Sequence, residues 1–334
     1  MIKRCWQALA LAMALALPGL ASAAGSAPDG AATPTADKYQ TWRAAAAQTL
    51  IDSGDADSLA TAAALRHIGL AARSRADSAA LKSTVELAGK AGELAPENPT
   101  IIWLRLQLCA ASAGCDIRDA ATTMRWVDAE NGAAWIATLA AAQKDGDAVE
   151  VDRIIADMAH GAYFDLYWNR TVVLLFDALK RAGGRLPARY VPSDVARLLE
   201  AMEIASAETI PSLTPLLNAC REPAGGERRD LCLRVAKIMQ RGDTVVAQLA
   251  GLSIERRLTP PDSKEGRSVA ERRRVLEWRV SNANRFDLPA LPWLINSRAR
   301  ARVAQMRAMP REEDVDIAIL RGHKIPLEPP EEHR

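Results

Sequence analysis

The chain has 334 residues, a formal net charge of +2, and 49% apolar and 25% charged residues. It is long enough to bury a large hydrophobic core, and its length fits one or two domains. Alanine is abundant, whereas glycine (19 residues), tyrosine (4) and phenylalanine (3) are sparse, and this composition favours helices over sheets.

The first 23 residues have the three parts of a cleavable secretory signal. Lys3 and Arg4 precede an apolar run over residues 6–17, and Ala21-Ser22-Ala23 provides the small residues that signal peptidase requires. The apolar run is shorter than the ~20 residues that a membrane-spanning helix needs. No later stretch reaches that length, so we expect no transmembrane segment in the mature protein. We expect cleavage after Ala23 and a periplasmic or secreted, soluble product of zero net charge.

Four cysteines remain in the expected mature protein, and their spacing suggests two local disulfides, Cys109–Cys115 and Cys220–Cys232. In an oxidising compartment such pairs form and persist. A zinc site is the alternative, but the spacings contain no C-x-x-C and no histidine lies beside them. We therefore predict no metal site.

Residues 24–36 are small, contain Pro and Gly, and lack periodicity, so they are expected to form a flexible leader. Helices are then predicted over 37–53, 55–73 and 77–94. Pro96 and Pro99 separate this block from the next.

Two segments between residues 95 and 135 echo each other. APENPTIIW ends at Trp103 and DAENGAAW ends at Trp135, and each Trp is expected near the start of a helix. The step Gly-Asp occurs at Gly54-Asp55, Gly146-Asp147 and Gly242-Asp243. Glycine tolerates the left-handed conformation that ends a helix, and aspartate caps the next one, so we predict a helix–turn–helix joint at each step.

These residues resemble a tetratricopeptide-type repeat. In that family a Trp begins the first helix and Gly-Asp lies at the turn, a spacing that Trp135 and Gly146-Asp147 keep. The sequence departs from the family at Ala129, where Pro is usual, and at Leu139 and Val151, where small residues are usual. The resemblance covers one repeat and a degenerate one before it. It implies an α-solenoid with an extended concave surface suited to proteins and peptides.

Further helices are predicted over 162–182, 193–206, 211–220, 227–241, 243–257, 265–285 and 290–309. The expected fold is thus all-α, an array of helical hairpins with about ten to twelve helices in a domain spanning 37–310. A subdivision is possible near 183–192, where Gly and Pro interrupt the pattern. Residues 311–334 are expected to form an acidic, Pro-rich extended tail.

An aromatic cluster is one candidate binding groove: Tyr163, Phe164, Tyr167 and Trp168. On the helix predicted over 162–182, residues four apart share a face, so the rings would form a stripe for a peptide or a sugar. The alternative is that the rings fill the core between repeats.

A basic C-terminal region is the candidate surface for an anionic envelope component. Residues 256–311 carry 14 Lys or Arg against 5 Asp or Glu, and the patch is represented by Arg298, Arg300, Arg302 and Arg307. The alternative is internal neutralisation, because residues 312–334 carry 7 acidic and 3 basic side chains and could fold back upon it. Nucleic acid is not expected as a partner, since the region has no base-stacking motif.

No catalytic motif is present: there is no G-x-S-x-G, no H-E-x-x-H and no phosphate-binding glycine loop. We predict no catalytic residues and no cofactor, and we interpret His67 as a structural histidine. The expected function is non-catalytic binding or scaffolding in the bacterial cell envelope, with a protein or peptide partner. The alternative is an envelope hydrolase acting on cell-wall material through carboxylates that the sequence does not identify.

Overall fold

A computed structural model describes residues 34–71, 78–112, 114–184, 193–221, 226–285 and 295–330. The predicted signal over 1–23 lies outside these ranges, as do most of the predicted leader and the possible subdivision near 183–192, apart from Gly183 and Gly184. The last three residues of the leader form the start of the first described helix.

The described ranges contain helices and no strands, which confirms the all-α prediction. They hold fifteen α-helices, more than the ten to twelve expected, and one 3-10 helix, η1. The helices of the first half are α2 (Pro34–Ser53), α3 (Ala56–Ala71), α4 (Ser78–Leu94), α5 (Pro99–Ala110), α6 (Ile117–Val127), η1 (Gly132–Trp135), α7 (Ile136–Asp145), α8 (Ala148–His160) and α9 (Trp168–Ala182). Those of the second half are α10 (Ser193–Glu208), α11 (Thr214–Ala219), α12 (Glu227–Met239), α13 (Val245–Leu258), α14 (Lys264–Ala283), α15 (Ile295–Ala308) and α16 (Glu312–Gly322).

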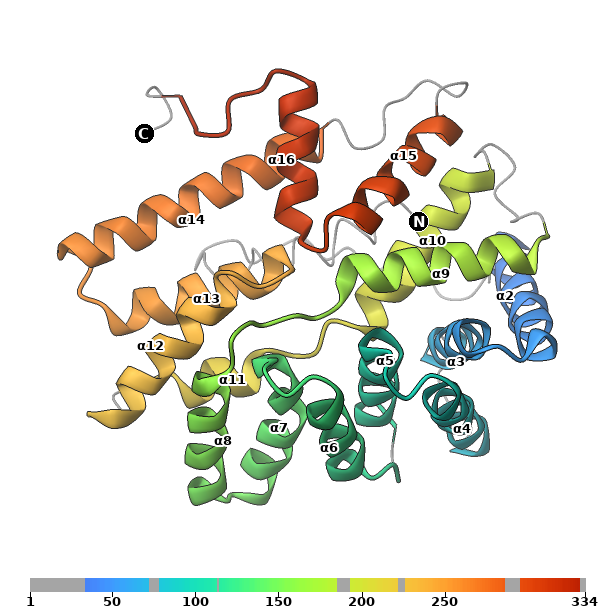
Figure 1. Cartoon of the computed structure of the whole chain (residues 1–334), viewed down its shortest axis with the longest axis horizontal. Coiled ribbons are helices and arrows are strands. Elements are labelled where there is room, and N and C mark those ends of the chain that lie inside the picture. The colour runs from blue at the N-terminus through green and yellow to red at the C-terminus, as the bar shows by residue number, and fades with distance from the viewer. Residues whose placement is uncertain are drawn as a thin grey trace.

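Helices that follow one another in sequence pack as hairpins, and other contacts join helices that are far apart in sequence. The pairs α2–α3, α3–α4, α5–α6, α7–α8 and α12–α13 are consecutive, whereas α8 packs on α12, α9 on α15 and α14 on α16. In Figure 1, α5 to α8 stand in a row below α9, α12 to α14 lie on one side, and α15 and α16 lie above α9. The polypeptide therefore also folds back on itself, and a solenoid arrangement remains a prediction.

Two large hydrophobic cores meet at α5. One core contains Trp103 and Leu106 of α5 together with side chains of α6 to α8 and α11 to α13. The other contains Leu104 and Leu108 of α5 together with side chains of α2 to α4, α9, α10, α15 and α16. A helix that is apolar on all sides is stable only when it is covered on all sides. This explains why α5 lies between the two cores.

The capping residues act as the sequence predicts at several helix starts. Gly54 and Gly146 adopt positive φ values of 73° and 70°, and the side chain of Asp147 accepts a hydrogen bond from Glu150 N at 3.0 Å. Asn98 caps α5 and Asn131 caps η1 through backbone N–H groups two residues ahead, at 3.1 and 3.0 Å. The two echoed segments thus share a physical role, which is to begin a helix.

Two predictions about local structure are wrong. The helix predicted over 162–182 begins only at Trp168, and the residues before it are not helical. The extended tail predicted over 311–334 contains helix α16, which packs on α14. Arg279 of α14 holds the C-terminal segment through an ion pair with Glu313 at 2.7 Å and a hydrogen bond to Leu327 O at 3.0 Å.

Both predicted cysteine pairs are bonded. Cys109–Cys115 connects the end of α5 to the residues before α6, and Cys220–Cys232 connects the end of α11 to α12, with Cα separations of 5.3 and 5.6 Å. Among the described helices, none is long and apolar enough to cross a bilayer.

Replacing both cysteines of a pair by alanine tests how much each bond stabilises the fold. Loop-closure entropy gives losses of about 3 kcal/mol for Cys220→Ala with Cys232→Ala and about 2 kcal/mol for Cys109→Ala with Cys115→Ala, because the first bond closes the longer loop. Urea unfolding of the oxidised proteins would measure both. Variants that are as stable as the parent would contradict this account. The parent protein with both disulfides reduced should have a urea midpoint no higher than that of either variant.

Candidate functional site

The aromatic cluster is mainly part of the core. Phe164 and Tyr167 are each 1% exposed and Trp168 is 7% exposed, whereas Tyr163 is 37% exposed. Tyr163 and Tyr167 do not share a helix face, because the residues before Trp168 are not helical and Tyr167 itself has a φ of 58°. The prediction of an open aromatic groove is therefore wrong for three of the four rings, and the alternative of core packing holds for them.

Polar side chains hold the segment that carries this cluster. The hydroxyls of Tyr163 and Tyr167 both donate to the carboxylate of Asp128. Both polar atoms of the Asn131 side-chain amide form hydrogen bonds with the backbone of Asp165. Nδ2 donates to Asp165 O at 2.9 Å, and Oδ1 accepts from Asp165 N at 3.0 Å. The polar residues of the echoed segment DAENGAAW thus fix the backbone of residues 163–167.

Asp243 also holds this segment. Its carboxyl accepts hydrogen bonds from Leu166 N at 2.7 Å and Trp168 N at 3.1 Å. It does not cap α13, which is capped by Thr244. A helix–turn–helix joint does lie at Gly242-Asp243, between α12 and α13, but the prediction that the aspartate caps the next helix is wrong there. Gly242 is needed for close approach, because a Cβ there would lie 2.8 Å from Phe164 O.

Asp165 and Asp243 form a buried carboxyl pair. Both residues are at most 7% exposed, and the two carboxyls are close enough for the charge of Asp165 to act on Asp243. Burial, and then the charge of Asp165 and the hydrogen bond to it, raises the pKa of Asp243 well above its usual value. Arg170 forms an ion pair with Asp165 at 3.1 Å.

The basic patch is mostly neutralised by other parts of the protein. Arg307 pairs with Asp177 of α9 at 2.5 Å and Arg300 with Asp194 of α10 at 3.4 Å. Arg302 is buried and lies 3.8 Å from Asp316 of α16. Arg298 is half-buried. Three of the four arginines therefore bind α15 to its neighbours. Only Asp316 belongs to the tail expected to fold back on the patch, whereas Asp177 and Asp194 lie in α9 and α10.

His67 and Glu208 form a similar contact inside the fold. His67 is 9% exposed, and its Nδ1 lies 2.7 Å from the carboxylate of Glu208, which joins α3 to α10. This placement agrees with a structural histidine. Among the residues that the structure describes, no group of three His, Cys, Asp or Glu side chains could hold a metal ion.

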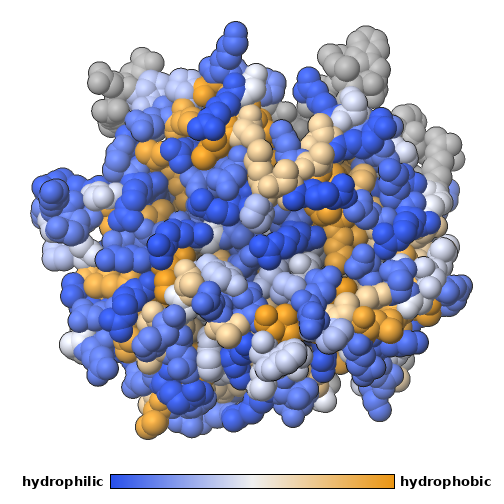
Figure 2. Space-filling view, in the orientation of Figure 1, coloured by the Kyte–Doolittle hydropathy of each residue, from blue (hydrophilic) through white to orange (hydrophobic). Residues whose placement is uncertain are grey.

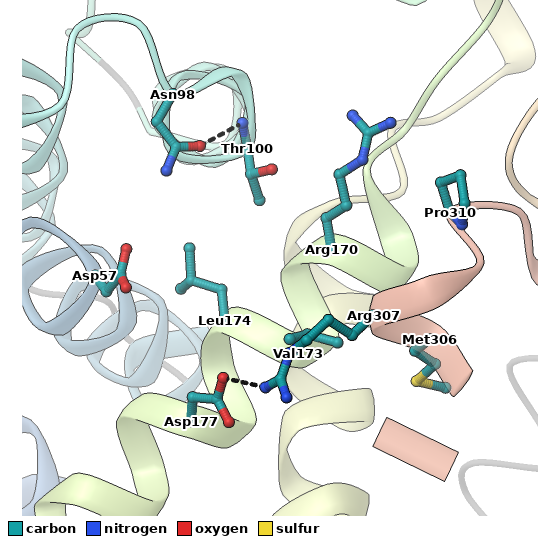
Figure 3. A pocket seen from close by; sticks show the side chains of 10 residues that line it. All are labelled: Asp57, Asn98, Thr100, Arg170, Val173, Leu174, Asp177, Met306, Arg307 and Pro310. Carbon is teal, nitrogen blue, oxygen red and sulfur yellow. Dashed lines mark hydrogen bonds and ion pairs between the residues drawn. The ribbon is translucent and has the colours of Figure 1, made fainter. Parts of the chain in front are cut away.

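A pocket of about 300 Å³ lies between α3, the start of α5, α9 and the end of α15 (Figure 3). It contains two carboxyls in unlike surroundings. Burial raises the pKa of Asp57, and the nearby charge of Arg181 opposes that rise. Asp57 lies 3.9 Å from Arg181, whereas Asp177 is paired more closely with Arg307, at 2.5 Å. The remaining lining residues are Asn98, Thr100, Arg170, Val173, Leu174, Met306 and Pro310.

A second pocket of about 220 Å³ lies among α6, α7 and α8. Its central feature is the half-buried ring of Trp135, with the guanidinium of Arg125 4.2 Å and that of Arg153 5.5 Å from the ring centroid. Cation–π contacts of this kind hold a guanidinium flat against an aromatic face. Sequence reasoning missed this pocket, although Arg118, Thr122 and Arg125 recur at helical spacing just before Trp135.

None of the protein-family models, curated proteins or solved structures with which the protein was compared matches it.

The carboxyl pair predicts a distinctive pH dependence of stability. The pKa of Asp243 is raised on folding, so its contribution is complete below the unfolded-state pKa of about 4 and is lost as the pH rises toward the folded-state pKa. Asp243→Asn cannot titrate. The parent should therefore lose stability relative to this variant by up to about 1.4 kcal/mol per pH unit within that window.

Urea unfolding at several values between about pH 4 and pH 8 would measure the difference. Asp147→Asn is the matched control, because that carboxylate caps an exposed helix end. Parallel pH profiles for the parent and Asp243→Asn would refute the raised pKa of Asp243.

Proposed function

We propose that the protein is an exported, non-catalytic binding or scaffolding protein of the bacterial cell envelope that holds a protein or peptide partner. Export is supported by the signal-like residues 1–23 and by the two disulfides, since such bonds persist in oxidising compartments. Binding is supported by the surface formed by α6, α7 and α8, which we call the α6–α8 face.

The observation that carries the proposal is the exposure of two large apolar side chains on the α6–α8 face. Trp126 of α6 is 75% exposed and Val149 of α8 is 81% exposed. Trp126 lies four residues after Thr122, and Val149 four residues before Arg153. Residues four apart share a helix face, and both Thr122 and Arg153 line the second pocket.

This combination resembles the energetic centre of a protein interface. Trp and Arg are the residues most enriched among the few that dominate binding energy, and Trp is rarely left so exposed in a monomer. On the side of the molecule drawn in Figure 2, apolar side chains occur in small groups separated by polar ones. A partner held by a few apolar anchors within a polar surround fits such a surface.

One observation favours a second candidate, the envelope hydrolase. The pocket in Figure 3 contains Asp57 and Asp177, whose environments differ. Hydrolysis of a glycosidic bond needs one carboxyl that holds a proton and one that is ionised. In this pocket, however, Asp177 is already engaged by Arg307, so the binding function is the better supported of the two.

The proposal is tested by capture of the partner from an envelope extract. C-terminally tagged protein, purified from the cells that export it, should enrich a specific partner, and Trp126→Ser with Val149→Ser should reduce that enrichment at least about tenfold. The control is Leu94→Ser with Leu199→Ser, which removes two exposed apolar side chains from α4 and α10 and should change nothing.

Equal losses in both double variants would contradict the assignment to the α6–α8 face. Release of soluble fragments from purified cell wall by the parent, abolished in Asp57→Asn, would replace binding by the hydrolase function.

A further inference from the structure

Of the three arginines that line the pocket around Trp135, two have carboxylate partners and one has none among the described residues. Arg153 donates to both oxygens of Glu150 at 2.7 and 2.6 Å and to Asp157 at 2.6 Å. Arg118 lies 3.5 Å from Asp145. Arg153 and Arg118 thus each have a carboxylate partner within this group of helices.

Arg125 is the exception. Its Nη2 donates to the neutral hydroxyl of Thr122 at 2.9 Å, and no carboxylate of the described residues lies within ion-pair distance. Its Nη1 is buried and has no acceptor among the described residues. Burial, and then the charge of Arg153, lowers the pKa of Arg125. A buried donor on a charged group that lacks an acceptor destabilises the folded state. The placement of Arg125 therefore lowers the stability of the protein when no ligand is bound.

A carboxylate is the complement that this arrangement lacks. A guanidinium presents parallel N–H groups that match the two oxygens of a carboxylate, and Trp135 holds the plane of Arg125 in place. Glu150 also lines the pocket, and its charge disfavours a dianion such as phosphate more than a single carboxylate. Because Arg125 is a single positive charge without a carboxylate partner among the described residues, the pocket favours a ligand group with one negative charge.

The size of the pocket restricts the ligand further. Sites for whole small molecules are typically ~300–1,000 Å³, whereas this pocket is about 220 Å³. It accommodates one acidic side chain or one peptide terminus, and the rest of a longer ligand would lie across the exposed surface beside it. Trp126 and Val149 are exposed on α6 and α8, two of the helices that line the pocket.

We propose that Arg125, positioned by Trp135, binds a carboxylate of a peptide or protein partner that lies on the α6–α8 face. This inference rests on the proposed binding function and adds the chemical class of the anchor. The carboxylate comes either from an acidic side chain or from the C-terminus of the partner, and both would be recognised by the same guanidinium.

Peptide binding to the purified full-length protein tests the proposal. Calorimetric titrations would use amidated oligoglutamate as the side-chain probe, oligoalanine with a free C-terminus as the terminal probe, amidated oligoglutamine as the neutral control and inorganic phosphate as the dianion. We expect binding of one or both carboxylate probes, no binding of oligoglutamine, and weaker binding of phosphate. Arg125→Gln should weaken the carboxylate probe about ten- to hundredfold, the range for a buried charge-assisted pair.

Two further variants separate binding from folding. Arg256→Gln removes an exposed arginine that does not line the pocket and should leave affinity unchanged. Arg125→Lys keeps the charge without the planar fork and should bind with intermediate affinity. Arg125→Gln should melt at the same temperature as the parent or higher, because it removes an unsatisfied buried donor; a purely structural arginine would give a lower melting temperature.

Failure of both carboxylate probes to bind the parent, or equal losses in Arg125→Gln and Arg256→Gln, would overturn the proposal. Tighter binding of phosphate than of either peptide would overturn it as well. If the partner capture described above survives Arg125→Gln but is lost with Trp126→Ser and Val149→Ser, the carboxylate anchor is wrong while the proposed function stands.

Discussion

The two halves of the molecule depend on one constraint, the non-helical segment from Gly161 to Tyr167 together with Trp168, the first residue of α9. Phe164, Leu166 and Tyr167 enter one core and Trp168 enters the other. The buried backbone groups of this segment cannot use helical hydrogen bonds, so side chains distant in sequence, those of Asn131 and Asp243, satisfy them. The same Asp243 accepts a backbone hydrogen bond from Glu312 at 2.7 Å, which ties the C-terminal helix α16 to this point. Loss of these partners would leave buried polar groups unsatisfied in the middle of the fold.

Sequence reasoning succeeded where structure is determined locally. Helix caps such as Asp147, the left-handed glycines before them and the two short-range disulfides depend on neighbours within about a dozen residues. Prediction from the sequence failed where contacts with residues distant in the sequence determine the local backbone. The sequence prediction extends the helix of residues 168–182 back to residue 162, although four of the six residues before Trp168 are Tyr, Phe or Asp, which are weak helix formers. Contacts with Asn131 and Asp243 hold this segment in a non-helical backbone. Gly242-Asp243 repeats the local signal of Gly146-Asp147, but its carboxyl turns to another segment instead of the next helix.

The candidate sites also depend on contacts between residues that are distant in the sequence. A run of arginines suggests an anion-binding surface, but Asp177, Asp194 and Asp316 reach α15 only through the tertiary fold and engage three of those arginines. Arg125, in contrast, has no carboxylate partner among the described residues, and it lies in a helix that contributes little to the overall charge pattern. Its position over Trp135 depends on how α6 packs against α7, which charge counting along the sequence does not reveal. What sets Arg125 apart is a buried Nη1 without an acceptor among the described residues, on a guanidinium that lies over Trp135, and this combination is a property of the fold.

Native-state hydrogen exchange at Leu166 and Trp168 tests most directly whether the carboxyl of Asp243 holds the two cores together. Both amides lie outside any helical hydrogen-bond ladder, and Asp243 is the acceptor of each. If the account is correct, they exchange as slowly as amides in the centre of α5 or α9, through unfolding of the whole structure, and Asp243→Asn accelerates the exchange of at least one of them. Exchange as fast as that of an exposed turn, such as the one at Gly146, would contradict it.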